Sequence, residues 1–148
     1  MIEITGLTAV SDEKCILDNI DIHIKKGDFA VIFSPETETG HTLIHCIMGY
    51  NRDYKGSVKV NCDMRDVRYI PDDILWDEYS TAGEYMLMVA GASGNYDIKM
   101  QEMLCGKFNV HMDEKLLEIT FEDNKLVQII AALCSNPQLL ILNMPQNF

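Results

Sequence analysis

Positively charged residues are few in this chain, and the imbalance excludes one class of partner. The 148 residues include 12 Lys and Arg against 23 Asp and Glu, which gives a formal net charge of −11 at pH 7. Nucleic acid and anionic membrane surfaces carry the same sign, so we expect neither as a direct partner. Long apolar runs are also missing, and those present are far too short to span a bilayer.

Regularly spaced cysteines are missing as well. The five cysteines lie far apart, form no CxxC pair and are odd in number. The N-terminal stretch MIEITGLTAV lacks the basic and apolar segments of a secretory signal. These absences favour reduced thiols in a cytosolic protein over a disulfide framework. The cysteines are Cys15, Cys46, Cys62, Cys105 and Cys134.

The first half of the chain has the apolar patterns of strands around one loop and helix. The length and an apolar fraction of 47% fit one globular domain with a sizeable core. Residues 1–7 and 19–29 alternate as half-buried strands do. Residues 29–33, FAVIF, are apolar throughout, which predicts a fully buried strand of a parallel sheet. The loop at 34–39 precedes a short helix that ends near Gly49.

The middle of the chain predicts two more strands and then a change of character. Residues 54–61 and 66–71 have the pattern of short strands, and residues 72–79 form a loop. From Ser80 to about Met112 the sequence is helical and rich in methionine. We interpret this stretch as a helical insert.

The clearest helix pattern lies near the end of the chain. Thr120 and Asp123 resemble a capping box at its start, and Asn136-Pro137 ends it. Residues 139–143, LLILN, predict a second apolar strand, so the whole layout is α/β with a parallel core sheet. The expected buried stripe of the helix is Leu126, Val127, Ile129, Ile130 and Leu133.

The order of these pieces resembles the ATPase domain of ABC transporters, the ATP-binding cassette. ILDNIDIHIKKGDFAVIFSP resembles the antiparallel hairpin and strand that lead into the family's Walker A loop, and HTLIHCIMGY resembles the helix after it. The family's Q-loop and the entry to its helical subdomain resemble residues VRYIPDDILWDEYSTAGEYML. The helix after the signature motif and the Walker B strand resemble residues LVQIIAALCSNPQLLILNMP. The resemblance covers the whole chain and implies a P-loop NTPase-like fold with an N-terminal antiparallel part.

The family's functional positions are filled by other residues. In an ungapped match the central Walker A glycines fall at Thr37 and Thr39, and the lysine falls at Gly40. A slip of one residue keeps Gly40 and Thr42 but puts His41 in place of the lysine. The candidate nucleotide-binding positions that the resemblance implies are Ser34, Pro35, Thr39, Gly40, His41 and Thr42 for Walker A, Asp72 for the Q-loop glutamine and Asn143 for the Walker B aspartate.

The catalytic positions are replaced in the same way. The signature motif falls on ITFED, residues 119–123, with Phe and Glu in place of both glycines, and the catalytic glutamate falls at Met144. The adenine-stacking aromatic would lie near Val10 or Ser11, neither of which can stack. The D-loop and the switch histidine would lie beyond Phe148, so we expect the C-terminal part of the family domain to be absent.

Physical chemistry argues against a working nucleotide site. Threonine at 37 and 39 restricts the backbone freedom that lets glycines wrap a phosphate. Glu36 and Glu38 would repel a triphosphate, by about 1 kcal/mol per charge pair at 4 Å in water and about 4 kcal/mol at an effective dielectric of 20. Our hypothesis is that one of these carboxylates occupies the helix N-terminus in place of phosphate. Met144 can neither orient nor deprotonate water.

Other candidate residues have ordinary alternatives. His41 and His45 could share a helix face as zinc ligands, but no third ligand is evident, so we predict no metal site. The carboxylates of the 72–79 loop could do acid–base work or simply be solvated. Trp76 and Tyr79 could anchor a partner or close that loop. The methionines of the insert could form core or an adaptable docking surface.

These observations predict one ABC ATPase-like domain over residues 1–148. Residues 1–79 and 118–148 form its α/β core, and residues 80–117 form the helical subdomain. The leading hypothesis is a catalytically inactive subunit without cofactor or catalytic residues. It would form a homo- or hetero-oligomer and partner a membrane permease or an active ABC ATPase subunit, in the cytoplasm or at the inner face of the membrane. The alternative is an ABC ATPase subunit that still binds ATP and magnesium and uses a partner's site.

Overall fold

The computed structural model describes residues 1–11, 14–34, 36–72 and 80–143. The chain divides into two compact units, one built from Met1–Arg65 and one from Asp66–Met144. Among the described residues, no helix is both long and apolar enough to cross a membrane.

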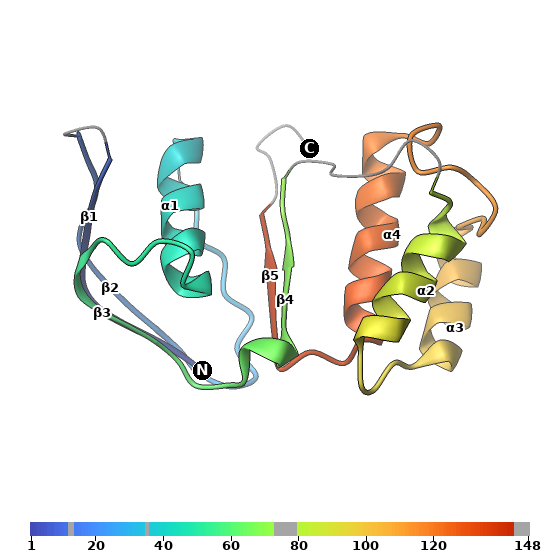
Figure 1. Cartoon of the computed structure of the whole chain (residues 1–148), viewed down its shortest axis with the longest axis horizontal. Coiled ribbons are helices and arrows are strands. Elements are labelled where there is room, and N and C mark those ends of the chain that lie inside the picture. Colours follow the sequence, from blue (N-terminus) through green and yellow to red (C-terminus); the bar gives the residue numbers. More distant parts are fainter. Residues whose placement is uncertain (12–13, 35, 73–79, 144–148) are drawn as a thin grey trace. The chain divides into compact units, whose positions relative to one another are not determined.

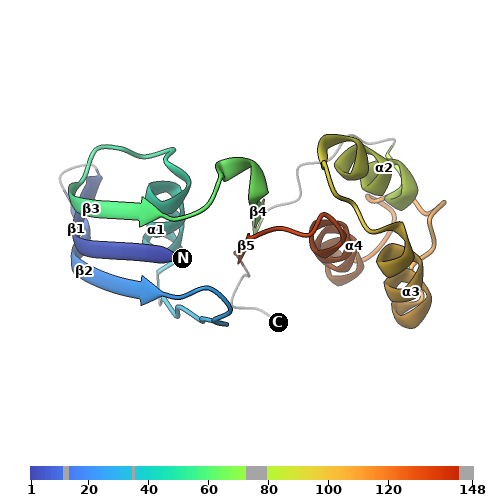
Figure 2. The same cartoon turned by 90° about the horizontal axis from the view of Figure 1, so that it is seen from below.

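An antiparallel sheet and one helix make up the first unit. The sheet consists of β1 (Ile2–Ser11), β2 (Lys14–Ile24) and β3 (Lys55–Val60), with β1 between the other two (Figure 2). The apolar side of β1 is buried, and α1 (Thr37–Met48) packs against β2 and β3 (Figure 1). Gly49 ends α1 as predicted, because its left-handed φ of 73° favours glycine. The core residues are Ile2, Ile4, Leu7, Ala9, Leu17, Leu43, Cys46 and Ile47.

Residues 29–33 do not form the buried strand that their apolar sequence predicts. The structure places them in an extended coil between β2 and α1, drawn without an arrow in Figure 1. Phe29, Val31 and Phe33 are 93%, 78% and 80% exposed. A strand requires a neighbouring strand for its backbone hydrogen bonds. Residues 29–33 have no such neighbour among the described residues of the first unit. The prediction was wrong because an apolar composition favours burial of a segment but does not provide the neighbouring strand that its backbone needs.

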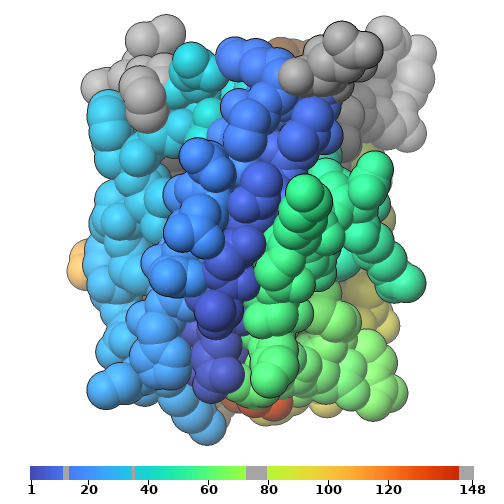
Figure 3. Space-filling view, turned by 90° about the vertical axis from the view of Figure 1, so that its left-hand side faces the viewer, coloured from blue at the N-terminus to red at the C-terminus, as the bar shows by residue number. Residues whose placement is uncertain are grey.

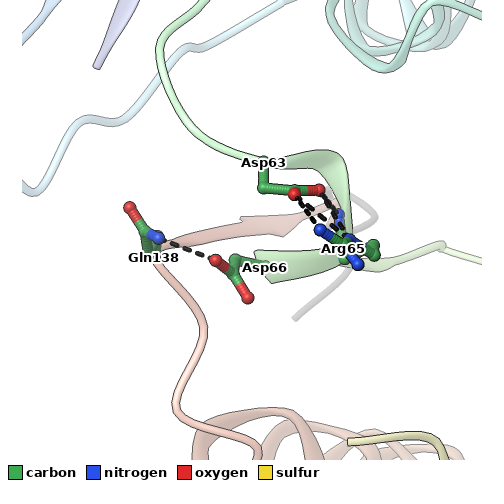
Figure 4. Close-up of polar contacts among 4 residues, drawn as sticks. All are labelled: Asp63, Arg65, Asp66 and Gln138. Atoms are coloured by element: carbon green, nitrogen blue, oxygen red, sulfur yellow. Dashed lines mark hydrogen bonds and ion pairs between the residues drawn. The ribbon is translucent and has the colours of Figure 1, made fainter. Parts of the chain in front are cut away.

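A parallel sheet, as predicted, is found in the second unit. A 3-10 turn, η1 (Met64–Asp66), leads into β4 (Val67–Ile70), which pairs in parallel with β5 (Leu139–Leu142). At the amino ends of these strands, Gln138 Nε2 donates to Asp66 Oδ2 at 2.7 Å, and the Gln138 N–H donates to the Asp66 carbonyl at 2.9 Å (Figure 4). This double link fixes the start of the parallel register.

Three helices of the second unit follow β4. They are α2 (Ala82–Ala92), α3 (Ile98–Phe108) and α4 (Phe121–Cys134). Two of them, α2 and α3, lie in the range predicted as a helical subdomain. A capping box starts α2, in which Thr81 Oγ1 accepts from the Glu84 N–H and the Glu84 carboxylate accepts from the Thr81 N–H. The helices share one core, which contains Ala82, Met86, Cys105, Leu116, Val127, Ile130, Ala131 and Cys134. Two of the methionines assigned to the insert, Met86 and Met100, therefore contribute to core packing.

The predicted buried stripe of α4 is only partly correct. Val127 and Ile130 are buried, but Leu133 is 38% exposed. Three polar residues, Asn124, Lys125 and Gln128, are buried instead. They tolerate burial because partners satisfy their polar groups, which a pattern of apolar spacing does not reveal.

Candidate functional site

Part of the segment that resembles the Walker A loop forms the first turn of a helix. Helix α1 already begins at Thr37, and Glu36 is its N-cap residue with an extended backbone. The N–H groups of Thr39 and Gly40 both donate to the Glu36 carbonyl, at 3.2 and 3.5 Å. A phosphate loop needs backbone N–H groups that point at the ligand. Here two of those donors are used inside the helix.

The carboxylates of this loop do not cap the helix as the hypothesis supposed. The Glu36 side chain makes no capping hydrogen bond, and its Oε2 instead pairs with Lys14 Nζ at 3.2 Å. Glu38 lies in the first turn, where its charge is favourable toward the helix dipole. The Glu36 carbonyl accepts a further hydrogen bond, from Ser34 Oγ at 2.7 Å.

The remaining Walker A positions lie on α1 itself. Thr39, Gly40, His41 and Thr42 are half-buried residues of its first half. A Cβ added at Gly40 would meet no atom within 4 Å, so glycine is not required there by close packing. Pro35 lies outside the described residues.

The rings of the two histidines of α1 stack on each other. The rings of His41 and His45 stack with centroids 6.3 Å apart, and His45 meets Tyr50 edge-on at 5.9 Å. Within the described residues, no group of three or more His, Cys, Asp or Glu side chains could hold a metal ion.

The Q-loop and Walker B positions lie at the carboxyl ends of β4 and β5. Asp72 follows β4 by one residue after Pro71, and Asn143 directly follows β5. The Asn143 N–H donates to the Ile70 carbonyl at 2.9 Å, which extends the parallel ladder. Ligands of α/β proteins bind at this edge of a parallel sheet, so the second unit brings these two positions to the expected place.

Asn143 carries an amide at the position that the resemblance assigns to the Walker B aspartate. Its side chain is neutral, and its Nδ2 is buried without a hydrogen-bond partner among the described residues.

The Walker A positions belong to the first unit and Asp72 and Asn143 to the second. Met144, Asp73, Asp77, Glu78, Trp76 and Tyr79, which the sequence also singled out, lie outside the described residues.

The residues at the signature position start α4. Thr120 Oγ1 accepts from the Asp123 N–H at 3.1 Å and donates to the Asp123 carboxylate at 2.7 Å, so the predicted capping role is confirmed. A cavity of about 270 Å³ lies beside Ile119 and Asp123. Its wall also includes Ala82, Phe108, Val110, His111 and Glu114. Sequence reasoning missed this cavity because separate segments of the insert contribute its lining.

Lys125 is the residue that sequence reasoning missed most clearly. It is 1% exposed, its Nζ donates to the Pro71 carbonyl, and the same nitrogen lies 5.3 Å above the Phe121 ring. It therefore ties the start of α4 to the residue before Asp72. A lysine is usually taken as a surface residue. The available signal was its i,i+4 spacing from Phe121.

All five cysteines are free thiols. Burial is the main cause that raises the pKa of Cys134 to about 11, and the neighbouring Cys105 and Asp97 raise it further. Burial also raises the pKa of Cys105 and of Cys46. These three thiols are therefore protonated at neutral pH and are weak nucleophiles.

The fold is similar to that of ATP-binding cassettes of known structure. A solved structure from Pyrococcus furiosus, described as an ABC transporter ATP-binding protein, matches with a TM-score of 0.82 at 21% identity, over 99% of this chain and 78% of that chain. The structure of an ATP-binding subunit of an ABC transporter matches with a TM-score of 0.77 at 20% identity, over 95% and 65% of the two chains. The predicted fold class is therefore confirmed.

The sequence relatives agree with the fold. Zinc import ATP-binding protein ZnuC of Wolbachia pipientis is 27% identical over 150 residues, which cover 98% of this chain and 60% of that protein. No family model matches the chain. The resemblance to the ABC transporter ATPase domain is confirmed by these homologues and structural neighbours together. The chain spans about 60% of the length of the ZnuC proteins of two Wolbachia strains that it matches.

Proposed function

We propose that this chain is an ABC transporter ATP-binding-domain-like subunit that does not hydrolyse ATP. It acts as a binding or regulatory partner of a transporter or of an active ATPase subunit. The observation that carries the proposal is the start of α1, where the N–H groups of Thr39 and Gly40 are bonded to the Glu36 carbonyl. A triphosphate would have to break these bonds before it could use those donors.

The charges around the loop support the same reading. Lys14 lies close to the loop, but its Nζ is already paired with the Glu36 carboxylate. Glu38 adds a second negative charge in the first turn of α1. A triphosphate 4 Å from one such carboxylate would be opposed by about 1 kcal/mol per charge pair in water. No lysine at the position of Gly40 or His41 offsets that repulsion.

The Walker B position supports the absence of hydrolysis. Phosphoryl transfer depends on metal ions that neutralise developing charge and on a group that orients the attacking water. Asn143 provides only a neutral amide, and Met144 of the sequence provides no base. Gly40, Thr42 and Asn143 are therefore vestiges of a site, and neither ATP nor magnesium is needed for the role proposed.

The expected partners follow from the family. Relatives such as ZnuC are import ATP-binding proteins by name. For this chain we propose a place in the cytoplasm, at the inner face of the membrane through a permease subunit. The predicted helical subdomain, with α2 and α3, is the surface that would meet such a partner. Leu87 and Met88 on α2 and Met103 on α3 are exposed there.

Two measurements test the proposal. Titration calorimetry of the whole chain with Mg-ATP should show no binding in the micromolar range, and a micromolar dissociation constant would refute the loss of the nucleotide site. Affinity purification of the tagged chain from its own cells should recover a permease or a second ATPase subunit. Recovery of neither would count against the regulatory role.

A further inference from the structure

Three sulfur atoms from three different helices meet in the core of the second unit. Met86 lies on α2, Cys105 on α3 and Cys134 on α4, and all three belong to the core that these helices share (Figures 1 and 2). Met86 and Cys134 are fully buried, and Cys105 is 7% exposed. All three residues lie within the same compact unit, so the cluster is complete inside it.

The spacing of these sulfurs is that of ligands on one metal ion. The Cys105 thiol donates to Met86 Sδ, and the two sulfurs are 3.9 Å apart. With metal–sulfur bonds of about 2.3 Å and the angles of a tetrahedral or trigonal centre, two ligating sulfurs lie about 3.8–4.0 Å apart. Cys105 and Cys134 are also neighbours, because burial and then the charge of Cys105 raise the pKa of Cys134. Cys105 therefore connects the other two sulfurs.

We propose that Met86, Cys105 and Cys134 form a buried three-sulfur site for one copper(I) ion. This inference goes beyond the proposed function, because it assigns a metal site that is separate from nucleotide binding. Its third donor is a thioether, so it differs in kind from a site made of three His, Cys, Asp or Glu side chains, which the described residues do not form.

The donor set selects the ion. Thiolate and thioether sulfurs are soft ligands and favour soft ions such as copper(I). Structural zinc sites almost always have four ligands, which are thiolates, imidazoles or carboxylates. The cluster provides three sulfurs, and the sulfur of Met86 is neutral. Copper(I) therefore fits this site better than zinc does.

The two thiols gain from a cation between them. Burial raises the pKa of Cys134 to about 11, Cys105 and Asp97 raise it further, and a hydrogen bond with Tyr96 opposes the rise. Burial also raises the pKa of Cys105. When copper(I) binds, each thiol releases its proton to the solvent, and the charge of the ion compensates the thiolates. Tyr96, whose hydroxyl donates to Gln101 at 2.7 Å, is an outer partner of the Cys134 sulfur.

Helix α3 provides the way in for the ion. Cys105 is the one buried residue among the 11 of this helix, and Met100 and Leu104 are only partly buried against the core. An element with so little buried surface opens locally at low cost. Movement of α3 away from the core exposes the Cys105 thiol, which is the first ligand that an entering ion meets.

The first experiment titrates the reduced whole chain with copper(I) without oxygen, in competition with the coloured chelator bicinchoninate. The wild type should withdraw one copper(I) ion per chain from the chelator. Cys105→Ala and Cys134→Ala should each lower the affinity more than about a hundredfold, since even outer partners of a metal contribute about 10–100-fold. The matched control is Cys15→Ala, which should leave the affinity unchanged. Cys15 is an exposed thiol on β2 of the first unit, and Figure 3 shows the strands of that unit in blue and green.

The second experiment keeps the core filled. Met86→Leu removes the thioether but conserves the volume, so the fold is retained. It should lower the copper(I) affinity about tenfold or more, and X-ray absorption should show three sulfur ligands in the wild type and two in this variant. The matched control is Met100→Leu, which changes another methionine packed against the same core and should alter neither result.

Several outcomes would overturn the proposal. A wild type that withdraws no copper(I) from the chelator would do so, as would copper(I) binding that survives in both alanine variants. Equal loss of affinity in Met86→Leu and Met100→Leu would show that loosening of the core, not the thioether, is responsible. Stoichiometric binding of zinc in place of copper(I) would contradict the choice of ion. A folded circular dichroism spectrum for each variant excludes misfolding as the cause.

Discussion

The buried amide of Asn124 provides the sharpest test of how the helical unit is held together. Asn124 is fully buried, its Nδ2 donates to the Leu116 carbonyl at 2.8 Å, and its Oδ1 accepts from Gln128 Nε2 at 2.8 Å. Asn124→Ala leaves both partners without this bond. Each buried polar group left unsatisfied costs about 1–3 kcal/mol, so the two partners together give an expected loss of unfolding free energy of about 2–6 kcal/mol. That is a large part of the total stability of about 5–15 kcal/mol typical of a domain.

A double-mutant cycle separates this network from simple loss of volume. Gln128→Ala alone should cost about 1–3 kcal/mol, because it frees only the Asn124 Oδ1. The double variant should cost less than the sum of the singles by about 0.5 kcal/mol or more, since Gln128 Nε2 is no longer present to be orphaned. Glu122→Gln, on the exposed side of α4, should change stability by less than about 0.5 kcal/mol.

The assay is urea unfolding followed by far-ultraviolet circular dichroism, with the denaturant slope checked in each variant. The reasoning fails if Asn124→Ala changes the unfolding free energy by no more than Glu122→Gln does. It also fails if the effects at 124 and 128 simply add, because the two amides would then not share one network.

Three further predictions concern single sites. Asp63 accepts hydrogen bonds from Arg65, which lowers its pKa to about 2 (Figure 4), so its contribution to stability is present above pH 4 and is lost as the pH falls toward 2. Arg65→Met should return the pKa toward 3.8 in a carbon-13 NMR titration, and an unmoved titration would contradict the assignment. Under native conditions iodoacetamide should modify the exposed Cys15 first and the buried Cys134 last, as mass spectrometry of the peptides would show; reversed order would be inconsistent with the burial. Gly49→Ala should destabilise the first unit by about 1 kcal/mol in a thermal melt, because alanine is strained at a φ of 73°, and a neutral effect would argue against that backbone conformation.

Local sequence patterns predicted most elements because the physics of each is local. The turn and helix end at Gly49, the cap at Thr120 and the alternation of the first strand all depend on residues near one another in the chain. The structure places each of them where the sequence indicated. A parallel sheet was also predicted from the order of strands and helices, but which strands pair, β4 with β5, appears only in the structure.

Features that depend on distant residues were not predictable in this way. The strand expected at 29–33 needs a neighbour that local composition cannot supply. The burial of Lys125 depends on the Pro71 carbonyl, and that of Asn124 on the Leu116 carbonyl. In the candidate site, the residues at the Walker A and Walker B positions could be assigned from the sequence. That the N–H groups of Thr39 and Gly40 donate to the Glu36 carbonyl appears only in the structure.

The double link between Asp66 and Gln138 has a kinetic consequence. These residues are separated by 72 positions along the chain, so pairing β4 with β5 closes a long loop and costs entropy before the short strands gain any contact. The intervening helices are built from near neighbours and can fold first, which shortens the effective loop. Amide protons of β4 and β5 should therefore gain protection late in refolding, and the strand pair serves as a reporter of whether the helices between them have already assembled.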